Sequence, residues 1–246
     1  MTVLVVRPGA QGAELVFQLQ QQGIAAMHCP LISYEPIASS PSTRMVLQDL
    51  SSYSIIMALS PRAVEFIQPW RAVEPFHWPT QVAYYAIGAA SAQALEQCCG
   101  QPVGYPLGRS SSESVLALPR FLRVAGERIL LLRGQGGRRR LVTSLTQRGA
   151  SVSLCECYQR VPIAYNGLEQ SDLWQQAGVN CLVVTSGELL QRLYTLVPKT
   201  AHRWLLHCSL LVVSPRLARL ATRLGWTSVV MADNADNAAL LRALVR

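Results

Sequence analysis

The chain has 246 residues, of which 50% are hydrophobic and 15% charged, and its formal net charge is +8. This length can bury one large core or two modest ones, and the apolar content excludes a disordered protein. No apolar run approaches the roughly 18 residues that cross a bilayer, and Val3–Val6 meets Arg7 without the leading charge of a signal peptide, so we expect a soluble cytoplasmic protein.

Short apolar runs rich in β-branched residues alternate with helical periodicity along the chain. In chain order, the expected strands and helices are Val3–Val6, Ala13–Gln22, Ser54–Leu59, a helix from Pro61, Val82–Ile87, Ala89–Gln97, Ile129–Leu132, Arg138–Arg148, Cys181–Val184, Glu188–Val197, Leu210–Val213, Leu217–Leu224, Ser228–Met231 and Asn237–Val245. Continuous apolar strands between helices predict parallel sheets covered on both faces. The crossings outnumber those of one flavodoxin-like sheet, so the sequence predicts an α/β protein with two sheets.

Two extended segments marked by proline interrupt this alternation, Cys29–Pro36 and Ser151–Val161, the second of which ends at Pro162. Neither has a helical period, and each could cross between two domains. If both cross, the middle of the chain is an insertion, and the first strand and helix belong with the last third. The pattern alone leaves this arrangement as one alternative.

Three turns that follow expected strands could bind an anion: Ser60-Pro61-Arg62, Thr185-Ser186-Gly187 and Ser214-Pro215-Arg216. In parallel α/β sheets, ligands bind where strands end and helices begin. Serine suits the N-cap and proline the first helical position, and such a helix end offers free N–H groups to an anion. Ser-Pro is also simply a good helix start, so each turn keeps a purely structural alternative.

The loop Arg133–Arg138 follows the strand Ile129–Leu132 and is rich in glycine. It lacks G-x-x-x-x-G-K, and Arg139 replaces the third glycine of a dinucleotide motif, so we expect no nucleotide site. The arginine run Arg138–Arg140 at a helix start is either a solvated face or an anion site. Ser110 and Glu113 have the spacing of a capping box, which we interpret as structural.

The remaining composition favours no metal site and no nucleophile. The seven cysteines have neither disulfide-framework nor C-x-x-C spacing, the four histidines lack metal spacing, and G-x-S-x-G is absent. Of the 22 basic residues only Lys199 is lysine, which leaves 21 arginines. Arginine matches carboxylates and phosphates, although nucleic acid would satisfy the charge equally well, and arginine in place of lysine on solvated faces would need no ligand.

The chain resembles the uroporphyrinogen-III synthase family over essentially its whole length. The resemblance is carried by the order and spacing of segments that are weak one by one: Leu4–Gly9, Ala58–Val64, Ala86–Gly88 with Ser91, Ile129–Gly134, Gly149-Ala150, Tyr158, Val183–Gly187 and Asp233–Leu240. One turn departs from the family, in which threonine often follows Gly-Pro at the penultimate helix. Here Arg216 follows Ser214-Pro215 and could bind a carboxylate instead.

The resemblance implies two flavodoxin-like parallel-sheet domains joined by two extended antiparallel linkers. It implies one domain from residues 1–36 and 162–246 and an inserted domain from 37–161. The activity implied is that of a monomeric, cyclising hydro-lyase of heme biosynthesis that needs no cofactor. Its substrate would be hydroxymethylbilane, a linear tetrapyrrole with eight carboxylates, and the preceding pathway enzyme is a candidate partner.

The resemblance also implies where the substrate is handled. We expect Tyr158 to act as the proton donor because it is the tyrosine of the second linker and carries an O–H. The expected substrate contacts are Arg7, Ser60, Arg62, Gly88, Ser91, Arg133, Gly134, Arg138, Thr185, Ser186, Gly187, Ser214 and Arg216.

Two other classes of protein compete with the enzyme. A two-lobed sensor would use the same helix ends to bind an anion without chemistry. A nucleic-acid binder would need aromatic stacking partners beside its basic residues, and Arg138–Arg140 has none in sequence.

Overall fold

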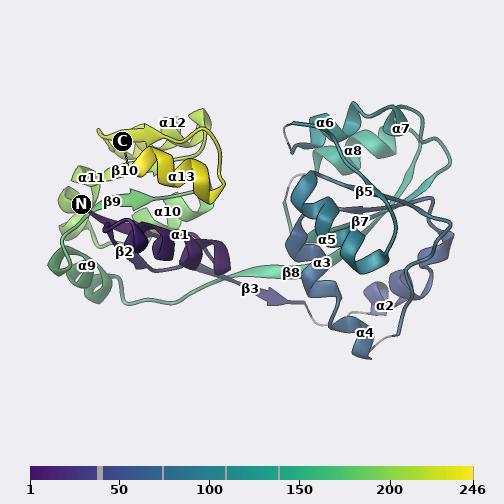
Figure 1. Ribbon diagram of the computed structural model, residues 1–246, viewed down its shortest axis with the longest axis horizontal. Coiled ribbons are helices and arrows are strands. Elements are labelled where there is room, and N and C mark those ends of the chain that lie inside the picture. The colour runs from purple at the N-terminus through teal and green to yellow at the C-terminus, as the bar shows by residue number, and fades with distance from the viewer. Residues whose placement is uncertain (38–40, 74, 109, 138, 246) are drawn as a thin grey trace. The chain divides into compact units, whose positions relative to one another are not determined.

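The computed structural model describes residues 1–37, 41–73, 75–108, 110–137 and 139–245. The chain divides into two compact units (Figure 1). Met1–Tyr34 and Val161–Arg246 form the first, here the end unit, and Glu35–Arg160 form the second, the middle unit.

The end unit holds a parallel sheet of five strands in the described part of the chain, in the order β11-β10-β9-β1-β2. Its strands are β1 (Thr2–Val5), β2 (Ala25–His28), β9 (Val179–Val183), β10 (Ser209–Val212) and β11 (Val229–Met231). Its helices are α1 (Ala10–Gln21), α9 (Gly167–Gln176), α10 (Gly187–Leu196), α11 (His202–His207), α12 (Pro215–Leu224) and α13 (Asn237–Leu244), with a 3₁₀ turn at Lys199–Ala201.

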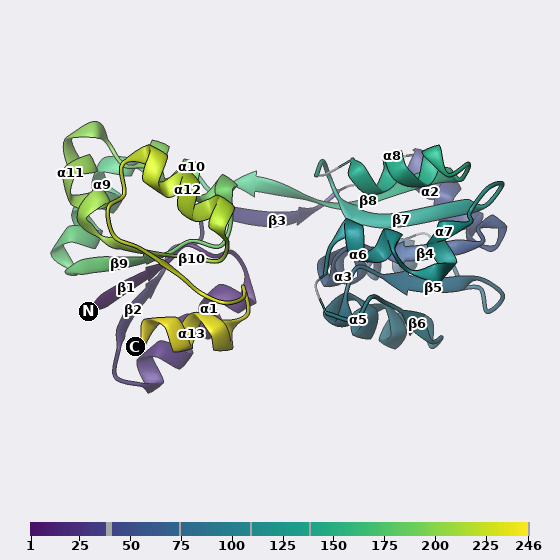
Figure 2. The ribbon, with the colours of Figure 1, turned by 90° about the horizontal axis from the view of Figure 1, so that it is seen from above.

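Both faces of this sheet are covered, as its continuous apolar strands require. Successive residues of a strand point to opposite faces. Val3 and Val5 accordingly pack with Leu15 and Leu19 of α1 and with α13, whereas Leu4 packs with residues of α9, α10, α11 and α12. Figure 2 shows α1 and α13 on one side of the sheet and α10 and α12 on the other.

The middle unit holds a sheet of six strands among the described residues, in the order β3-β8-β7-β4-β5-β6. Its strands are β3 (Ile32–Pro36), β4 (Ile55–Ala58), β5 (Ala83–Ala86), β6 (Val103–Gly104), β7 (Arg128–Gly134) and β8 (Ser151–Pro162). Its helices are α2 (Pro41–Gln48), α3 (Pro61–Ile67), α4 (Trp70–Val73), α5 (Ala89–Cys99), α6 (Ser112–Leu116), α7 (Pro119–Leu122) and α8 (Arg140–Gln147), with a 3₁₀ turn at Leu50–Ser52.

Strands β3 and β8 carry the two crossings between the units, and they are neighbours in the sheet. The N–H of Ile37 donates to the carbonyl of Cys157, and the N–H of Ile163 donates to the carbonyl of Leu31. Since the partner number falls as the residue number rises, this pair is antiparallel. The pairs β4–β5, β4–β7, β5–β6 and β7–β8 are parallel.

The two faces of the middle sheet are also covered by different helices. Ile55 and Met57 of β4 and Leu131 of β7 pack with α6, α7 and α8. Ile56 and Leu130 are equally buried and alternate with them, so they face the helices α3 and α5, which contact each other and β4. Figure 2 shows α8 and α5 on opposite sides of this sheet.

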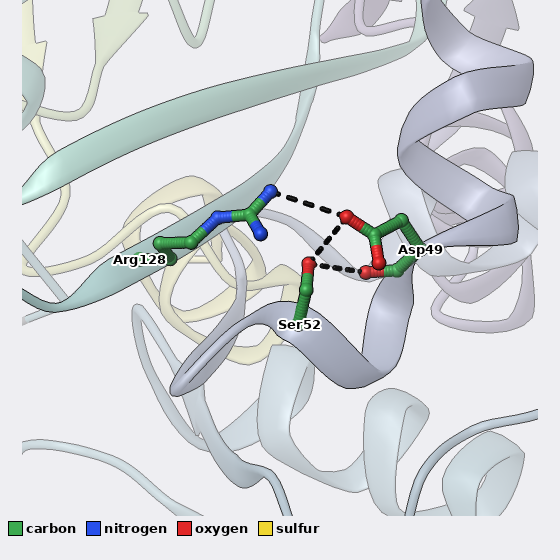
Figure 3. A network of polar contacts seen from close by, with 3 residues as sticks. All are labelled: Asp49, Ser52 and Arg128. Carbon is green, nitrogen blue, oxygen red and sulfur yellow. Dashed lines mark hydrogen bonds and ion pairs between the residues drawn. The ribbon is translucent and has the colours of Figure 1, made fainter.

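A polar network closes the amino end of β7 (Figure 3). Arg128 lies 3.2 Å from the Asp49 carboxylate, and the Ser52 hydroxyl donates to that carboxylate at 2.6 Å. These contacts lower the pKa of Asp49, with the hydrogen bond from Ser52 as the largest cause. The Arg128 guanidinium also lies over the Tyr53 ring, 4.9 Å from its centroid. This network joins the strand to the segment after α2, at the opposite end of the sheet from the turns singled out above.

The structure confirms the predicted α/β class and its parallel sheets, and each expected strand and helix is present within a few residues. Two expectations need correction. The N-cap of α6 is Ser111, whose hydroxyl accepts from the N–H of Ser114, and not Ser110. The helix expected from Arg138 begins at Arg140, and Arg138 itself lies outside the described residues. Among the helices of the described residues, none has the length and apolarity of a membrane span.

Candidate active site

The strand orders define one ligand-binding edge in each unit. If the strands of the end unit are numbered afresh in chain order, they lie in the flavodoxin order 2-1-3-4-5. The order reverses at β1, which has β2 on one side and β9 on the other. In the middle unit, the parallel strands β4 to β8, numbered afresh in chain order, lie in the order 3-2-1-4-5. This order reverses at β4, which has β5 on one side and β7 on the other. Open α/β sheets bind ligands at the carboxyl ends of the strands where the order reverses.

Some of the expected substrate contacts lie at these two reversals, whereas Gly88 and Ser91 follow β5, and Ser214 and Arg216 follow β10, each one strand further out. In the end unit, Arg7 follows β1 and Thr185–Gly187 follows β9. In the middle unit, Ser60 and Arg62 follow β4, and Arg133 and Gly134 end β7. Sequence periodicity alone does not show that these segments meet, because the strand order is a property of the fold.

Tyr158 lies at the middle unit's reversal. Its hydroxyl is 3.3 Å from the Ser60 hydroxyl, and its ring centroid is 5.6 Å from that of Phe66 in α3. The tyrosine is 6% exposed. Its carbonyl accepts the N–H of Gln135 at 2.7 Å, which ties β8 to the loop after β7. The side chain thus contacts Ser60 and Phe66, while the backbone of the same residue is bonded to the loop.

A β-bulge in β8 aims this side chain. Arg133 pairs with Glu156, but the next residue, Gly134, pairs with Tyr158, so Cys157 is an extra residue in β8. In a regular strand Tyr158 would project to the same face as Glu156. The extra residue reverses that direction and turns the tyrosine towards α3.

Gly134 provides the room for the tyrosine ring. A Cβ atom built at Gly134 would lie 2.5 Å from the Tyr158 Cζ and 2.9 Å from its hydroxyl oxygen. Gly88 plays a similar part at the end of β5, where a Cβ would lie 1.9 Å from the Ser110 hydroxyl. Both glycines are therefore required by close contact with a neighbouring side chain.

The serines at the helix starts are all engaged as N-caps. Ser60, Ser186 and Ser214 accept the N–H groups of Ala63, Leu189 and Leu217, at 3.1, 3.2 and 3.3 Å. In each cap the serine oxygen is the acceptor, so the hydroxyl proton is not used. Each hydroxyl can therefore donate its proton to a carboxylate or to a second hydroxyl. Thr185 and Gly187 are half-buried beside Ser186.

Arg7 is already engaged within the end unit. Its guanidinium donates to the carbonyl of Ala235 at 2.8 Å, to the side chain of Asn237 at 2.9 Å, and to the side chain of Gln11. These contacts join the turn after β1 to the turn before α13. If Arg7 also contacts a substrate, its guanidinium must bind the substrate and the turn before α13 at the same time.

The other predicted contacts differ in accessibility. Arg216 is exposed at the start of α12, and Arg62 is half-buried at the start of α3. Ser91 is 3% exposed in the first turn of α5 and offers little surface to a ligand. Arg133 is 7% exposed, and its Nε donates to the Gly134 carbonyl at 3.1 Å.

Cys157, the extra residue of the bulge, is held as a thiol. The hydrogen bond with Cys155 and then burial raise its pKa well above the ordinary value. The two sulfur atoms are 3.9 Å apart and both residues are buried. Among the residues that the structure describes, no cluster of three His, Cys, Asp or Glu side chains could hold a metal ion.

Comparison with known proteins adds an independent finding. The family model described as uroporphyrinogen-III synthase HemD matches residues 13–242. The uroporphyrinogen-III synthase of Escherichia coli is 47% identical over 245 residues, which cover 99% of this chain and 100% of that protein. The protein of the same name from Salmonella typhimurium is 46% identical over the same coverage.

Solved structures share the fold. A mutant uroporphyrinogen III synthase from Thermus thermophilus superposes with a TM-score of 0.68 at 17% identity, covering 100% of this chain and 99% of that one. The Helicobacter pylori synthetase gives a TM-score of 0.66 at 12% identity, covering 99% and 98%. At these identities the likeness concerns the two-unit α/β fold alone.

Proposed function

The chain belongs to the uroporphyrinogen-III synthase family, and we propose that it closes hydroxymethylbilane into uroporphyrinogen III, inverting the last pyrrole as it does so. The observation that carries this proposal is the 47% identity to a uroporphyrinogen-III synthase along the full length of both chains. The activity is that of a cyclising hydro-lyase in porphyrin and heme biosynthesis.

The substrate itself stabilises most of the charge that develops during the reaction. Loss of the terminal hydroxyl as water leaves an azafulvenium that its own pyrrole nitrogen stabilises. The last pyrrole attacks through its substituted carbon, which gives a spiro intermediate that fragments and recloses inverted. The proton consumed when water leaves is returned when the final pyrrole regains aromaticity, so the reaction has no net redox change.

Two tasks remain for the protein. It must hold the chain so that the substituted carbon meets the cation, which is a matter of proximity and orientation. It must also deliver a proton to the leaving hydroxyl, which is typically worth about 10²- to 10⁴-fold in rate.

Tyr158 is our candidate for the proton donor. The bulge and Gly134 hold its ring at the carboxyl edge of the middle sheet, and Ser60 lies 3.3 Å from its hydroxyl. Since the Ser60 oxygen accepts the N–H of Ala63, the serine proton is available to the tyrosine oxygen. That hydrogen bond would stabilise the phenolate left after proton transfer.

The substrate's carboxylates require several cationic or hydrogen-bonding groups. Candidate donors are the hydroxyls of Thr185, Ser186 and Ser214 and the guanidinium of Arg216, all at the carboxyl edge of the end sheet. Arg62 and the backbone at Gly88 and Gly187 are candidates of the same kind. We propose that the protein works as a cytoplasmic monomer, without nucleic acid or membrane as a partner.

The direct test of the proton donor is Tyr158→Phe. The variant should bind substrate as the wild type does and turn over about 10²- to 10⁴-fold more slowly, because only the proton is removed. Pre-steady-state measurement separates binding from turnover. Unchanged turnover would exclude Tyr158 from the mechanism. A sensor without catalytic activity, the alternative function, would bind an anion saturably and form no product in either variant.

A further inference from the structure

A pocket of about 510 Å³ lies beside the loop between β7 and α8, wholly within the middle unit. We call it the β7–α8 pocket. Its apolar lining includes Val142 of α8 and Leu154 of β8, and its polar lining includes Arg133, Arg139, Thr143 and Glu156.

Arg133 is a buried charge that lacks a counterion among the described residues. It is 7% exposed, and strand alternation places it on the α8 face with Ile129 and Leu131. The only hydrogen bond of its side chain to a described group runs from Nε to the Gly134 carbonyl, at 3.1 Å. A buried charge without a partner is destabilising, and Arg133 lines the pocket, so an anion bound there would satisfy the remaining donors of its guanidinium.

The start of α8 adds a second, independent preference for an anion. The helix runs Arg140–Gln147, and its N-cap residue, Arg139, makes no side-chain capping hydrogen bond. The N–H groups of the first helical turn and the positive end of the helix dipole therefore remain available to a negative group. Thr143, one turn along the helix, lines the same pocket.

The rest of the lining narrows the kind of anion. Glu156 places one carboxylate at the pocket, where it accepts the N–H of Gly136 at 3.2 Å, and this charge disfavours a multiply charged group such as phosphate. The apolar surfaces of Val142 and Leu154 favour a ligand with a short hydrocarbon stem. A single carboxylate on such a stem fits both features.

We propose that the β7–α8 pocket binds a carboxylate carried on a short apolar stem, and that this group is one carboxyalkyl side chain of the tetrapyrrole substrate. The identity of the occupant rests on the proposed function, whereas the chemistry of the pocket does not. Arg133 is then a specificity-determining residue that anchors one side chain of the substrate.

The test compares Arg133→Met with Arg133→Lys and with the control Arg140→Gln. Arg140 is exposed, pairs with Glu113 and lies outside the pocket. Four quantities are measured: kcat and KM for hydroxymethylbilane, the Kd of uroporphyrin III by fluorescence quenching, and the melting temperature without ligand, with propionate and with phosphate.

For Arg133→Met, KM and the uroporphyrin Kd should rise about 10- to 100-fold, since a hydrogen-bonded charge is lost, while kcat stays within about twofold. Its melting temperature without ligand should equal or exceed that of the wild type, because an unpaired buried charge has been removed. Propionate should raise the melting temperature of the wild type and not of Arg133→Met. Arg133→Lys should be intermediate, and Arg140→Gln should match the wild type.

Unchanged KM and Kd in Arg133→Met would overturn the proposal, and so would a lower melting temperature without ligand, which would mark Arg133 as a structural residue. If propionate or phosphate stabilises the wild type through Arg133 while KM is unchanged, the pocket serves a free anion and the substrate assignment is wrong. A wild type that forms no type III isomer would refute the proposed function instead, and the propionate titration would still decide whether the pocket binds a carboxylate.

Discussion

Gly134→Ala should disable the enzyme by displacing Tyr158. The new Cβ would lie 2.5 Å from the tyrosine Cζ, 2.6 Å from Cε2 and 2.9 Å from the hydroxyl oxygen. Carbon atoms in favourable contact are about 3.5–4.0 Å apart, so the ring must retreat by about 1 Å. The ring is buried and packs against Phe66, so it has little room to do so, and the variant should lose about 1–3 kcal/mol of stability.

The turnover rate of the variant should fall as well. The hydroxyl oxygens of Tyr158 and Ser60 are already 3.3 Å apart, and a shift of about 1 Å takes them out of hydrogen-bond range. Misplacing a reacting group by that distance costs about 10²-fold, so kcat should fall about 100-fold with little change in KM. Stopped-flow turnover with enzymatically generated hydroxymethylbilane measures this.

A double-mutant cycle identifies the cause. If Gly134→Ala acts through the Tyr158 hydroxyl, adding it to Tyr158→Phe should lower kcat by no more than about twofold beyond Tyr158→Phe alone. The reasoning is refuted if Gly134→Ala turns over at the wild-type rate, or if the double variant falls by the full product of the two single effects.

Three further predictions concern the stability of the fold and the reactivity of a thiol. Ser186→Ala removes the cap on the Leu189 N–H and should lower the unfolding free energy by about 1 kcal/mol; an unchanged urea midpoint would contradict this. Glu127 bonds Arg120 at 2.6 Å, which lowers its pKa below the ordinary 4.5, so the pair stabilises the fold above that value and the effect is lost as pH falls through the lowered pKa. Glu127→Gln should therefore cost about 0.5–1 kcal/mol at neutral pH and nothing in acid, as urea unfolding across pH would show. The Cys157 thiol, whose pKa is raised, should resist a disulfide reagent in the native protein and react once urea unfolds it.

The sequence predicts the buried parts of the fold well. The strands β1, β4, β7, β9 and β10 are continuous apolar runs because helices cover both of their faces, and that composition is visible without a structure. The edge strand β2 escapes prediction because Ala25–His28 is only partly buried, and β6 is too short to show a pattern. Helix α9 escapes because its apolar residues are few, and two of them, Leu168 and Leu173, are exposed.

The sequence predicts residues that the site contains, but it does not predict how they are arranged in space. Ser60, Thr185, Ser186 and Ser214 stand out as helix starts because capping is a local property of sequence. The bulge that turns Tyr158 towards α3 depends on the register between two strands, and no local signal encodes it. The error at α6 arises because Ser110, Ser111 and Ser112 are alike in sequence. In the structure Ser111 caps the helix, whereas the side chain of Ser110 lies against Gly88.

The most direct test of the account is the identity of the porphyrin isomer. Hydroxymethylbilane is generated in situ, the protein is added, and the products are oxidised and separated. Closure without the enzyme joins the free carbon of the last pyrrole and gives the type I isomer. The account predicts a switch to the type III isomer that grows with protein concentration, and type I alone from a folded protein would contradict it.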